Sequence, residues 1–206
     1  MFRLLFLCSF LVYSMAQMQQ QCTCGQVEPC KRGAENQVMG CADSCQRHVS
    51  GMGAPYSSIR ACIMQKQPMI NSVAQCQQRS LANTCAARPG GLVPKRYPET
   101  LKLAAFNEVN NMLRRSGLQA EAASFMAVGK KFAGCVMKCL NRGPGACFKR
   151  LGCGLALPPD NIIVQQTKSC AINAGFNTQG VQSLCQCVAG AGVKSLAPLC
   201  GRIQIT

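Results

Sequence analysis

The sequence predicts an all-α protein built as two small disulfide-stapled helical domains in tandem, joined by a Pro/Gly linker and a pair of longer helices. Cysteines and apolar residues recur at three- and four-residue spacing, at which side chains share one face of a helix. Alternating strand patterns are sparse. One arrangement of cysteines also occurs twice, which indicates two domains of one kind.

The repeated framework opens each time with a Gly-Cys pair and a second cysteine four residues later, at Cys41 and Cys45 and again at Cys135 and Cys139. On a helix the two cysteines of such a pair lie on one face. Each copy continues with a single cysteine, a Cys-Gln pair and a Ser-Leu-Ala run that leads to a last cysteine. These are Cys62, Cys76 and Cys85 in the first copy, and Cys170, Cys185 and Cys200 in the second.

Cysteine arithmetic predicts a fully oxidised protein. The chain has 17 cysteines, and Cys8 falls in the leader, so an even number remains for disulfides. These divide equally between the two halves, which favours pairing within each half, although eight cysteines allow about 105 connectivities. Cys147 and Cys153 lie in a segment inserted in the second copy and can pair with each other or pin the insertion to the core. The predicted framework is Cys22, Cys24, Cys30, Cys41, Cys45, Cys62, Cys76, Cys85, Cys135, Cys139, Cys147, Cys153, Cys170, Cys185, Cys187 and Cys200.

The first residues are typical of a secretory signal. Arg3 provides a short positive region, residues 4–13 are apolar but too few to span a bilayer, and small residues precede a cleavage site after Ala16. No later stretch reads as a transmembrane anchor, so we expect a secreted, extracellular protein. The predicted organisation is a signal peptide at 1–16, a first cysteine-rich domain at 17–88, a linker at 89–97 and a second cysteine-rich domain at 98–206.

The elements of the first domain follow from periodicity and helix breakers. Residues 17–21 are polar and Gln-rich, and we expect them to be disordered. A helix is expected over 34–49, and a second helix begins at Ser57 or Ser58, either of which is a good N-cap. Pro68 is expected to interrupt that helix. Two short helical pieces should follow, over 70–76 and 81–85.

Proline and glycine mark the linker. Arg88-Pro89-Gly90-Gly91 and Pro94 are expected to prevent regular structure here. The linker also contains the dibasic pair Lys95-Arg96, at which a processing protease could separate the two halves. An ordinary solvated pair of basic residues is the alternative interpretation.

The second domain begins with Pro98 and Glu99, which favour the first turn of a helix. That helix should close with basic residues and a left-handed Gly117. A longer helix is expected from Leu118 to the break at Gly143. Asp160 and Asn177 are then expected to cap two more helices.

Catalytic and metal chemistry find little support. The chain has one histidine, His48, and no Ser-His-acid or Cys-His-acid set is evident, so we expect no enzyme, no cofactor and no metal. Cys41, Cys45 and His48 could bind zinc from one helix face, but disulfides consume such thiols in an oxidising compartment. The close pairs Cys22/Cys24 and Cys185/Cys187 could be redox-active, whereas the duplicated framework favours static bridges.

A strong basic bias marks the middle of the chain, where twelve lysines and arginines stand against three acids between Arg88 and Arg150. A basic helical face of this kind can hold sulfated glycans or meet an anionic membrane surface, and a solvated helix surface is the alternative. Aromatic residues are few, so we expect no nucleic acid among the partners. The candidates for polyanion binding are Lys130, Lys131, Lys138, Arg142, Lys149 and Arg150.

A short motif and a family resemblance favour a protein of the extracellular matrix. Ser50-Gly51-Met52-Gly53 matches the Ser-Gly-x-Gly pattern at which glycosaminoglycan chains start, so Ser50 is a weak attachment candidate, and a plain turn is the alternative. The duplicated Cys-x3-Cys pattern, together with the runs 152–160, 168–172 and 185–189, resembles nematode secreted cysteine-rich proteins and is similar to the chondroitin-proteoglycan domain. That resemblance implies a small helical disulfide domain of the extracellular matrix or eggshell. The chain departs from it in being basic, with a formal net charge of +15, and in lacking acidic Ser-Gly clusters.

The function predicted from these features is that of a non-enzymatic secreted structural or binding component of an extracellular matrix, with matrix proteins or sulfated glycans as partners. The alternative is a membrane-active or lipid-binding secreted helical bundle. The apolar run from Ala122 to Val136 and the positive charge favour that alternative.

Overall fold

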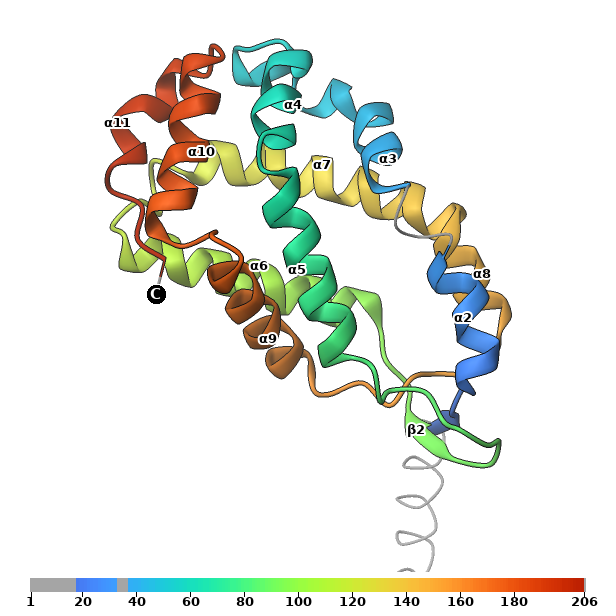
Figure 1. The fold of residues 1–206 in the computed structure, drawn as a ribbon. Helices are drawn as coiled ribbons and strands as arrows, with labels where there is room; N and C mark the ends of the chain where they lie inside the picture. Colours follow the sequence, from blue (N-terminus) through green and yellow to red (C-terminus); the bar gives the residue numbers. More distant parts are fainter. Residues whose placement is uncertain (1–17, 33–36, 206) are drawn as a thin grey trace, which may run out of the picture.

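The computed structural model describes residues 18–32 and 37–205, and helices make up most of this part of the chain (Figure 1). The predicted signal peptide, 1–16, lies outside the described residues. Together with the disulfides, the helices confirm the all-α, disulfide-stapled fold class. The elements are β1 (Met18–Gln20), α2 (Cys24–Arg32), α3 (Val38–Ser44), η1 (Gln46–His48), η2 (Ser50–Met52), α4 (Tyr56–Met64), α5 (Gln67–Ser80), β2 (Leu92–Pro94), α6 (Pro98–Arg115), α7 (Ala123–Arg142), α8 (Pro144–Arg150), α9 (Asp160–Asn173), α10 (Thr178–Gly190), η3 (Lys194–Leu196) and α11 (Ala197–Cys200).

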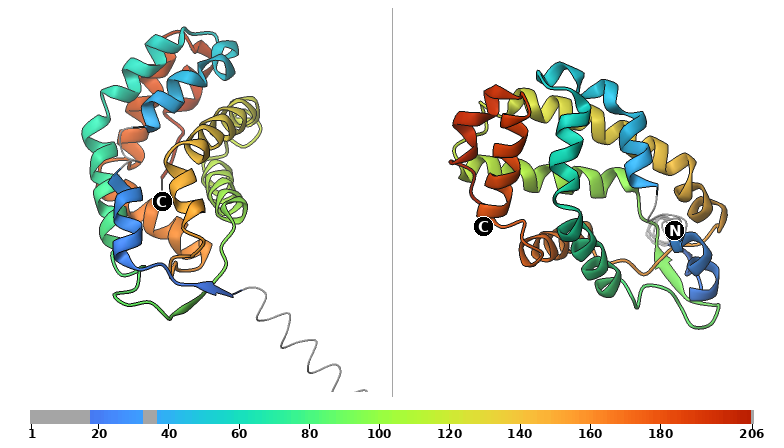
Figure 2. Two further views of the ribbon diagram at one scale, coloured as in Figure 1. Left: turned by 90° about the vertical axis from the view of Figure 1, so that its right-hand side faces the viewer. Right: turned by 45° about the horizontal axis from the view of Figure 1, so that its top comes forward.

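Helices from the two halves of the chain pack against each other. Each of four helices of the first half contacts a helix of the second half: α2 contacts α8, α3 contacts α7, α4 contacts α10 and α5 contacts α9. Seen edge-on in Figure 2 (left), α6 and α7 lie side by side on one flank, and α4 and α5 run along the other. The packing therefore interleaves the two cysteine-rich segments.

The disulfides follow the same pattern, and the expectation of pairing within each half is wrong. Of the eight disulfides among the described residues, six join a cysteine before the linker to one after it. The inserted cysteines do not pair with each other, because both bond to the N-terminal segment. The boundaries 17–88, 89–97 and 98–206 stay a prediction, but the disulfides do not keep within them. The pairs are Cys22–Cys153, Cys24–Cys85, Cys30–Cys147, Cys41–Cys139, Cys45–Cys135, Cys62–Cys187, Cys76–Cys170 and Cys185–Cys200.

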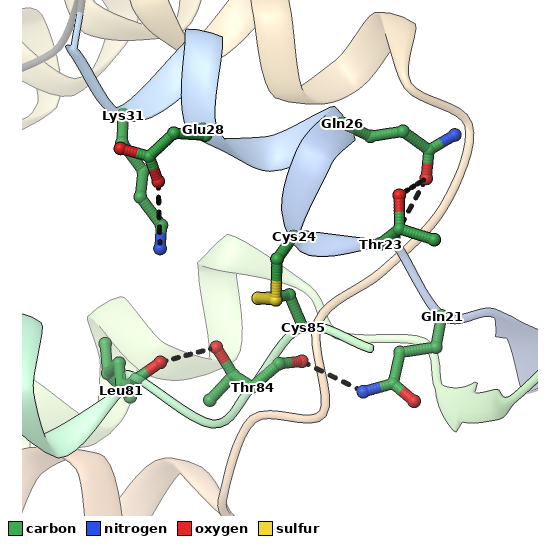
Figure 3. The surroundings of a disulfide bond; sticks show 9 residues. All are labelled: Gln21, Thr23, Cys24, Gln26, Glu28, Lys31, Leu81, Thr84 and Cys85. Atoms are coloured by element: carbon green, nitrogen blue, oxygen red, sulfur yellow. Dashed lines mark hydrogen bonds and ion pairs between the residues drawn. A yellow bond between two sulfur atoms is a disulfide. The ribbon is translucent and has the colours of Figure 1, made fainter. Parts of the chain in front are cut away.

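The N-terminal segment is ordered and pairs with other parts of the chain, so the expectation of disorder is wrong for residues 18–21. Strand β1 pairs antiparallel with β2, with Gln19 opposite Val93. Since β2 lies within the linker, its prolines and glycines do not prevent regular structure there. Beyond β1, the Cys24–Cys85 disulfide and the bond from Gln21 Nε2 to the Thr84 carbonyl, 3.1 Å long, fasten the same segment to the end of the first half (Figure 3).

Helix bounds in the first half differ from the periodic pattern. The helix expected over 34–49 is α3, which ends at Ser44 and gives way to two 3-10 turns; residues 34–36 lie outside the described part. Helix α4 begins at Tyr56 with Pro55 at its N-cap position, so neither Ser57 nor Ser58 caps it. Pro68 lies in the first turn of α5, where its missing N–H costs nothing, so the proline starts a helix. Helix α5 then runs unbroken to Ser80, through both the expected piece over 70–76 and the break after it.

The second half is closer to prediction. Helix α6 begins at Pro98 and ends in a Schellman motif, in which Gly117 takes φ +63° and the Leu118 N–H donates to the Leu113 carbonyl at 2.8 Å. The next helix, α7, begins at Ala123 rather than Leu118; residues 119–122 form turns, and Leu118 is buried, with 1% exposed. Asn177 caps α10 as expected, accepting from the Gly180 N–H at 3.0 Å. Asp160 starts α9, but its side chain makes no capping hydrogen bond.

The apolar core is small, so sulfur contributes much of the buried interior. One cluster of buried residues consists of Ala54, Ile59 and Val193, against which Phe125 and Val188 pack. Many of the other deeply buried apolar residues are cysteines in disulfides. A core of this size stabilises a fold only modestly, at roughly 25 cal/mol per Å² of apolar surface removed from water. The disulfides are therefore central to the stability of this fold.

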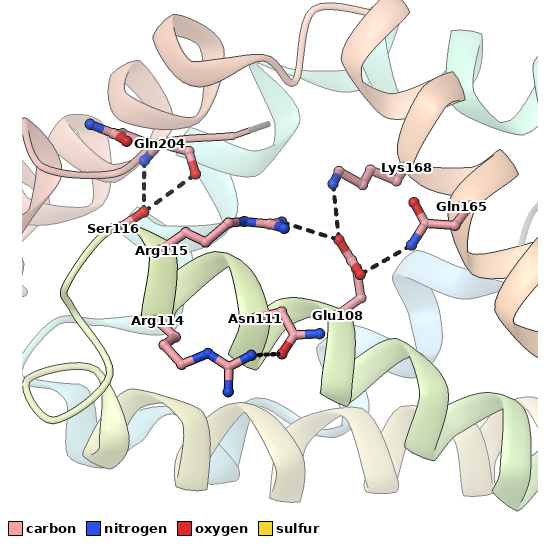
Figure 4. Close-up of polar contacts among 8 residues, drawn as sticks. All are labelled: Glu108, Asn111, Arg114, Arg115, Ser116, Gln165, Lys168 and Gln204. Atoms are coloured by element: carbon pink, nitrogen blue, oxygen red, sulfur yellow. Dashed lines mark hydrogen bonds and ion pairs between the residues drawn. The ribbon is translucent and has the colours of Figure 1, made fainter.

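A half-buried carboxylate joins α6 to α9. Glu108 accepts from Lys168 Nζ at 2.9 Å and from Gln165 Nε2 at 3.1 Å, and Arg115 lies 3.5 Å away (Figure 4). The Glu108 side chain is 14% exposed and that of Lys168 is 16% exposed. The hydrogen bond from Lys168 lowers the pKa of Glu108 below its ordinary value, and burial offsets this in part.

A second ion pair fixes α3 against α4. The Asp43 carboxylate accepts from Arg60 Nε at 2.7 Å and from the Tyr56 hydroxyl at 2.7 Å. The hydrogen bonds from Arg60 and Tyr56 lower the pKa of Asp43. Burial and the bond to Asp43 raise the pKa of Tyr56 to about 12, so the phenol keeps its proton and remains a donor at neutral pH.

A cut in the linker should leave the protein in one piece, because six disulfides cross from one side of it to the other. A protease could therefore not separate the halves, in contrast to the sequence-based expectation. We propose inserting a specific protease site between the exposed Arg88 and Pro89. After cleavage, electrophoresis should give one band without reductant and two bands with it. Release of a fragment without reductant would contradict the disulfide pattern.

Replacing Glu108 by Gln should destabilise the fold at neutral pH by roughly 1–3 kcal/mol, since the substitution leaves Lys168 poorly paired in a half-buried site. Because the folded-state pKa of Glu108 is lowered, its contribution is fully present above the unfolded pKa, about 4.3, and is lost as pH falls through the folded pKa. Urea unfolding at pH 7 and pH 3 measures this. The difference between wild type and Glu108→Gln should shrink at pH 3, and the exposed Glu99→Gln should change stability by less than about 0.5 kcal/mol.

Candidate anion-binding site

The six predicted polyanion-binding residues all lie on two consecutive helices. Four belong to α7 and two to the last turn of α8, and every one of their side chains is exposed. On α7, helical geometry places Lys130, Gly134 and Lys138 along one face, since successive members are four residues apart. The disulfide-bonded Cys135 and Cys139 point more than a quarter turn away, toward α3. The disulfides thus fix which face of α7 remains open.

Three of these residues converge on a hollow of about 380 Å³, at the small end of the range for ligand pockets. Lys138 and Arg142 of α7 line it together with Lys149 of α8, while Lys130, Lys131 and Arg150 do not. The first turn of α6 forms the opposite wall, where the positive end of the helix dipole adds to the local potential. The other lining residues are Pro98, Glu99, Lys102, Gly134, Met137 and Asn141.

Lys102 of α6 is a fourth cation in this hollow that does not belong to the six predicted residues. The position that a Cβ would take at Gly134 lies 3.9 Å from Lys102 Nζ, so the ammonium group lies close to α7. The same nitrogen is 5.9 Å from the centre of the Phe106 ring, and Lys130 Nζ is 5.6 Å from that centre. One aromatic ring thus holds a lysine from each helix, by an attraction worth roughly 0.5–1 kcal/mol at exposed sites.

The hairpin of α6 and α7 explains why Lys102 lies at this site. The helix stop at Gly117, which the sequence predicts, is the signal for that hairpin. Two helices that reverse near Gly117 run antiparallel, so residue 102 comes to lie beside the second half of the long helix. The predicted stop at Gly117 could therefore have placed Lys102 opposite Gly134 before the structure was known. The basic count between Arg88 and Arg150 includes Lys102, but periodicity along one helix cannot link it to the other.

Carboxylates do little to neutralise the hollow. Of the three acids in the basic region, Glu108 is engaged by Lys168 and Arg115, and Glu121 pairs with Arg202 at 3.0 Å. Glu99 is the one carboxylate among the lining residues, against four cations. Like charges brought together at a concave surface raise the local positive potential, which attracts anions and fades with added salt. The arrangement can therefore hold a multiply charged anion.

The remaining sequence candidates lie elsewhere. Ser50 is exposed at the start of η2, and its hydroxyl donates to the Arg47 carbonyl at 2.9 Å; glycan attachment at Ser50 stays a prediction. Cys41 and Cys45 are both in disulfides, which leaves no thiolates to bind zinc with His48. Neither close cysteine pair forms a bond of its own. Cys22 and Cys24 bond to separate partners, as do Cys185 and Cys187, so all four cysteines are in disulfides to residues outside their own pair.

None of the helices within residues 18–32 and 37–205 combines the length and the hydropathy that crossing a bilayer requires. Many disulfides are compatible with an extracellular protein, because such bonds persist in oxidising compartments. No family model, no curated protein and no solved structure matches this chain.

Proposed function

We propose that this protein is a non-enzymatic, secreted component of an extracellular matrix that binds sulfated glycans through the basic surface of α6, α7 and α8. The observation that carries the proposal is the convergence of Lys102, Lys138, Arg142 and Lys149, from three helices, on one hollow. Outside the cell, sulfated polysaccharides are polyanions that such a surface would meet. Charge-assisted hydrogen bonds from lysine and arginine to sulfate oxygens would supply the attraction.

The covalent frame supports a role in a matrix. Six disulfides tie the early and late parts of the chain together, and those of Cys135, Cys139 and Cys147 hold α7 and α8 to the early part even after a cut in the linker. A protein with a small apolar core gains durability in this way. The resemblance to the nematode chondroitin-proteoglycan domain agrees with a matrix or eggshell role. In our proposal this chain binds glycan, because it is basic and lacks acidic Ser-Gly clusters.

The lipid-binding alternative receives less support from the packing. It drew on the apolar run from Ala122 to Val136, yet within this run Ala122 is buried and Phe125 packs against the Ala54, Ile59 and Val193 cluster. Phe132 and Val136 are partly buried as well. An amphipathic helix that enters a bilayer surface needs a broad exposed apolar face. The side chains of this run are instead largely used in the fold.

Chromatography on immobilised chondroitin sulfate and heparin tests the proposed function. The wild-type protein should be retained above physiological salt and elute as screening grows. Replacing Lys130, Lys131, Lys138, Arg142, Lys149 and Arg150 together by Gln should bring elution to or below physiological salt, because the variant loses six exposed positive charges from α7 and α8.

Two outcomes would overturn this proposal. The first is elution of the wild-type protein at or below physiological salt. The second is unchanged retention of the six-residue variant, provided that disulfide mapping shows native pairs. Co-sedimentation with vesicles of phosphatidylserine and phosphatidylcholine is the parallel measurement. Strong vesicle binding combined with weak glycan retention would favour the lipid alternative.

A further inference from the structure

The hollow between α6, α7 and α8 brings donors together from three directions. Lys102 approaches from α6, Lys138 and Arg142 from α7, and Lys149 from α8. We propose that this hollow is a discrete subsite for one sulfate ester on a sugar residue of the glycan, with these four side chains as its ligands. The inference rests on the proposed function and deepens it, since a diffuse basic surface would retain glycans without any such subsite.

The chemistry of the lining favours a sulfate ester over a carboxylate. A sulfate ester presents three terminal oxygens in a pyramid, so donors on separate walls can reach it at once. A carboxylate has two oxygens in a plane and suits a single planar fork such as one guanidinium. Arg142 can supply such a fork, while the three lysines supply donors that rotate to their acceptors. We therefore expect a clear preference for sulfated glycans over hyaluronan, a polymer whose anionic groups are carboxylates.

Phe106 acts as a positioning residue for this subsite. Its ring lies within 6 Å of both Lys102 Nζ and Lys130 Nζ, at 5.9 Å and 5.6 Å. A flexible lysine loses side-chain entropy when it is held in one place to bind an anion. By attracting the two ammonium groups beforehand, the ring reduces that loss and fixes Lys102 at the wall of the hollow. Phe106 thus contributes to binding without carrying any charge itself.

The main test compares two variants of the full secreted chain that lose the same charge. The subsite variant carries Lys102→Gln, Lys138→Gln, Arg142→Gln and Lys149→Gln. The control variant replaces four exposed cations outside the hollow, in Arg47→Gln, Arg79→Gln, Arg88→Gln and Lys194→Gln. Calorimetric titration with a chondroitin sulfate hexasaccharide should show about tenfold or greater weakening for the subsite variant and about twofold for the control.

The outcomes separate this inference from the proposed function. Equal weakening of both variants would overturn the subsite and leave glycan binding by diffuse charge. Absence of binding by the wild-type protein would overturn both. A hyaluronan oligosaccharide of the same length serves as the unsulfated probe, and affinity equal to that for chondroitin sulfate would also overturn the sulfate assignment.

Two smaller changes test the positioning of Lys102 without a large loss of charge. Phe106→Leu keeps apolar volume but removes the ring, and Phe106→Tyr keeps the ring. The Leu variant should bind roughly threefold more weakly and the Tyr variant should bind like wild type. If Phe106→Leu fails to fold, the exposed single variants Lys102→Gln and Lys131→Gln decide the matter. Affinity should fall several-fold in the first and stay nearly unchanged in the second, and equal effects would contradict the role of Lys102.

Discussion

The fold depends on the pair of disulfides that clamps α3 to α7. Cysteines four residues apart share a helix face, and two such helices set antiparallel can join Cys41 to Cys139 and Cys45 to Cys135. The two bonds together fix the distance, the direction and the rotation of α7 relative to α3, which a single bond would not. Each closes a loop of 90 residues or more, for which the loss of unfolded-chain entropy is on the order of 4–5 kcal/mol.

The disulfides join the two copies of the predicted cysteine framework to each other. The first cysteine of one Cys-x3-Cys pair bonds to the second of the other, and the converse bond is also made, as at a two-fold axis where each contact occurs twice. The later bonds nearly follow this rule. Cys76 bonds to Cys170, and strict reciprocity would then join Cys62 to Cys185, whereas Cys62 bonds to Cys187, two residues away. The displaced Cys185 bonds instead to Cys200 within its own copy.

Features that depend on nearby residues could be predicted from the sequence, whereas contacts between distant residues could not. The bounds of α6 follow from a proline and an acid at its start and a left-handed glycine after its end, and these signals act within a few residues. Cysteine partners depend on which helices meet, and composition gives no measure of that. An equal number of cysteines in each half suits pairing within halves and reciprocal pairing between them equally well. The β1–β2 pairing was missed for the same reason, since the partner strands are more than 70 residues apart.

The disulfides also determine how the walls of the candidate site are positioned. Disulfides turn one face of α7 toward α3, which leaves Lys138 at the hollow and Lys130 beside the Phe106 ring of α6. The chain returns along α6, so that Lys102 comes from a helix with no disulfide of its own, held by the Glu108–Lys168 pair and by the ring of Phe106. Two walls of the hollow are thus covalently fixed, while the third is positioned by weaker contacts that can adjust. In our proposal, a subsite with one adjustable wall would accept sulfate at different ring positions of a glycan.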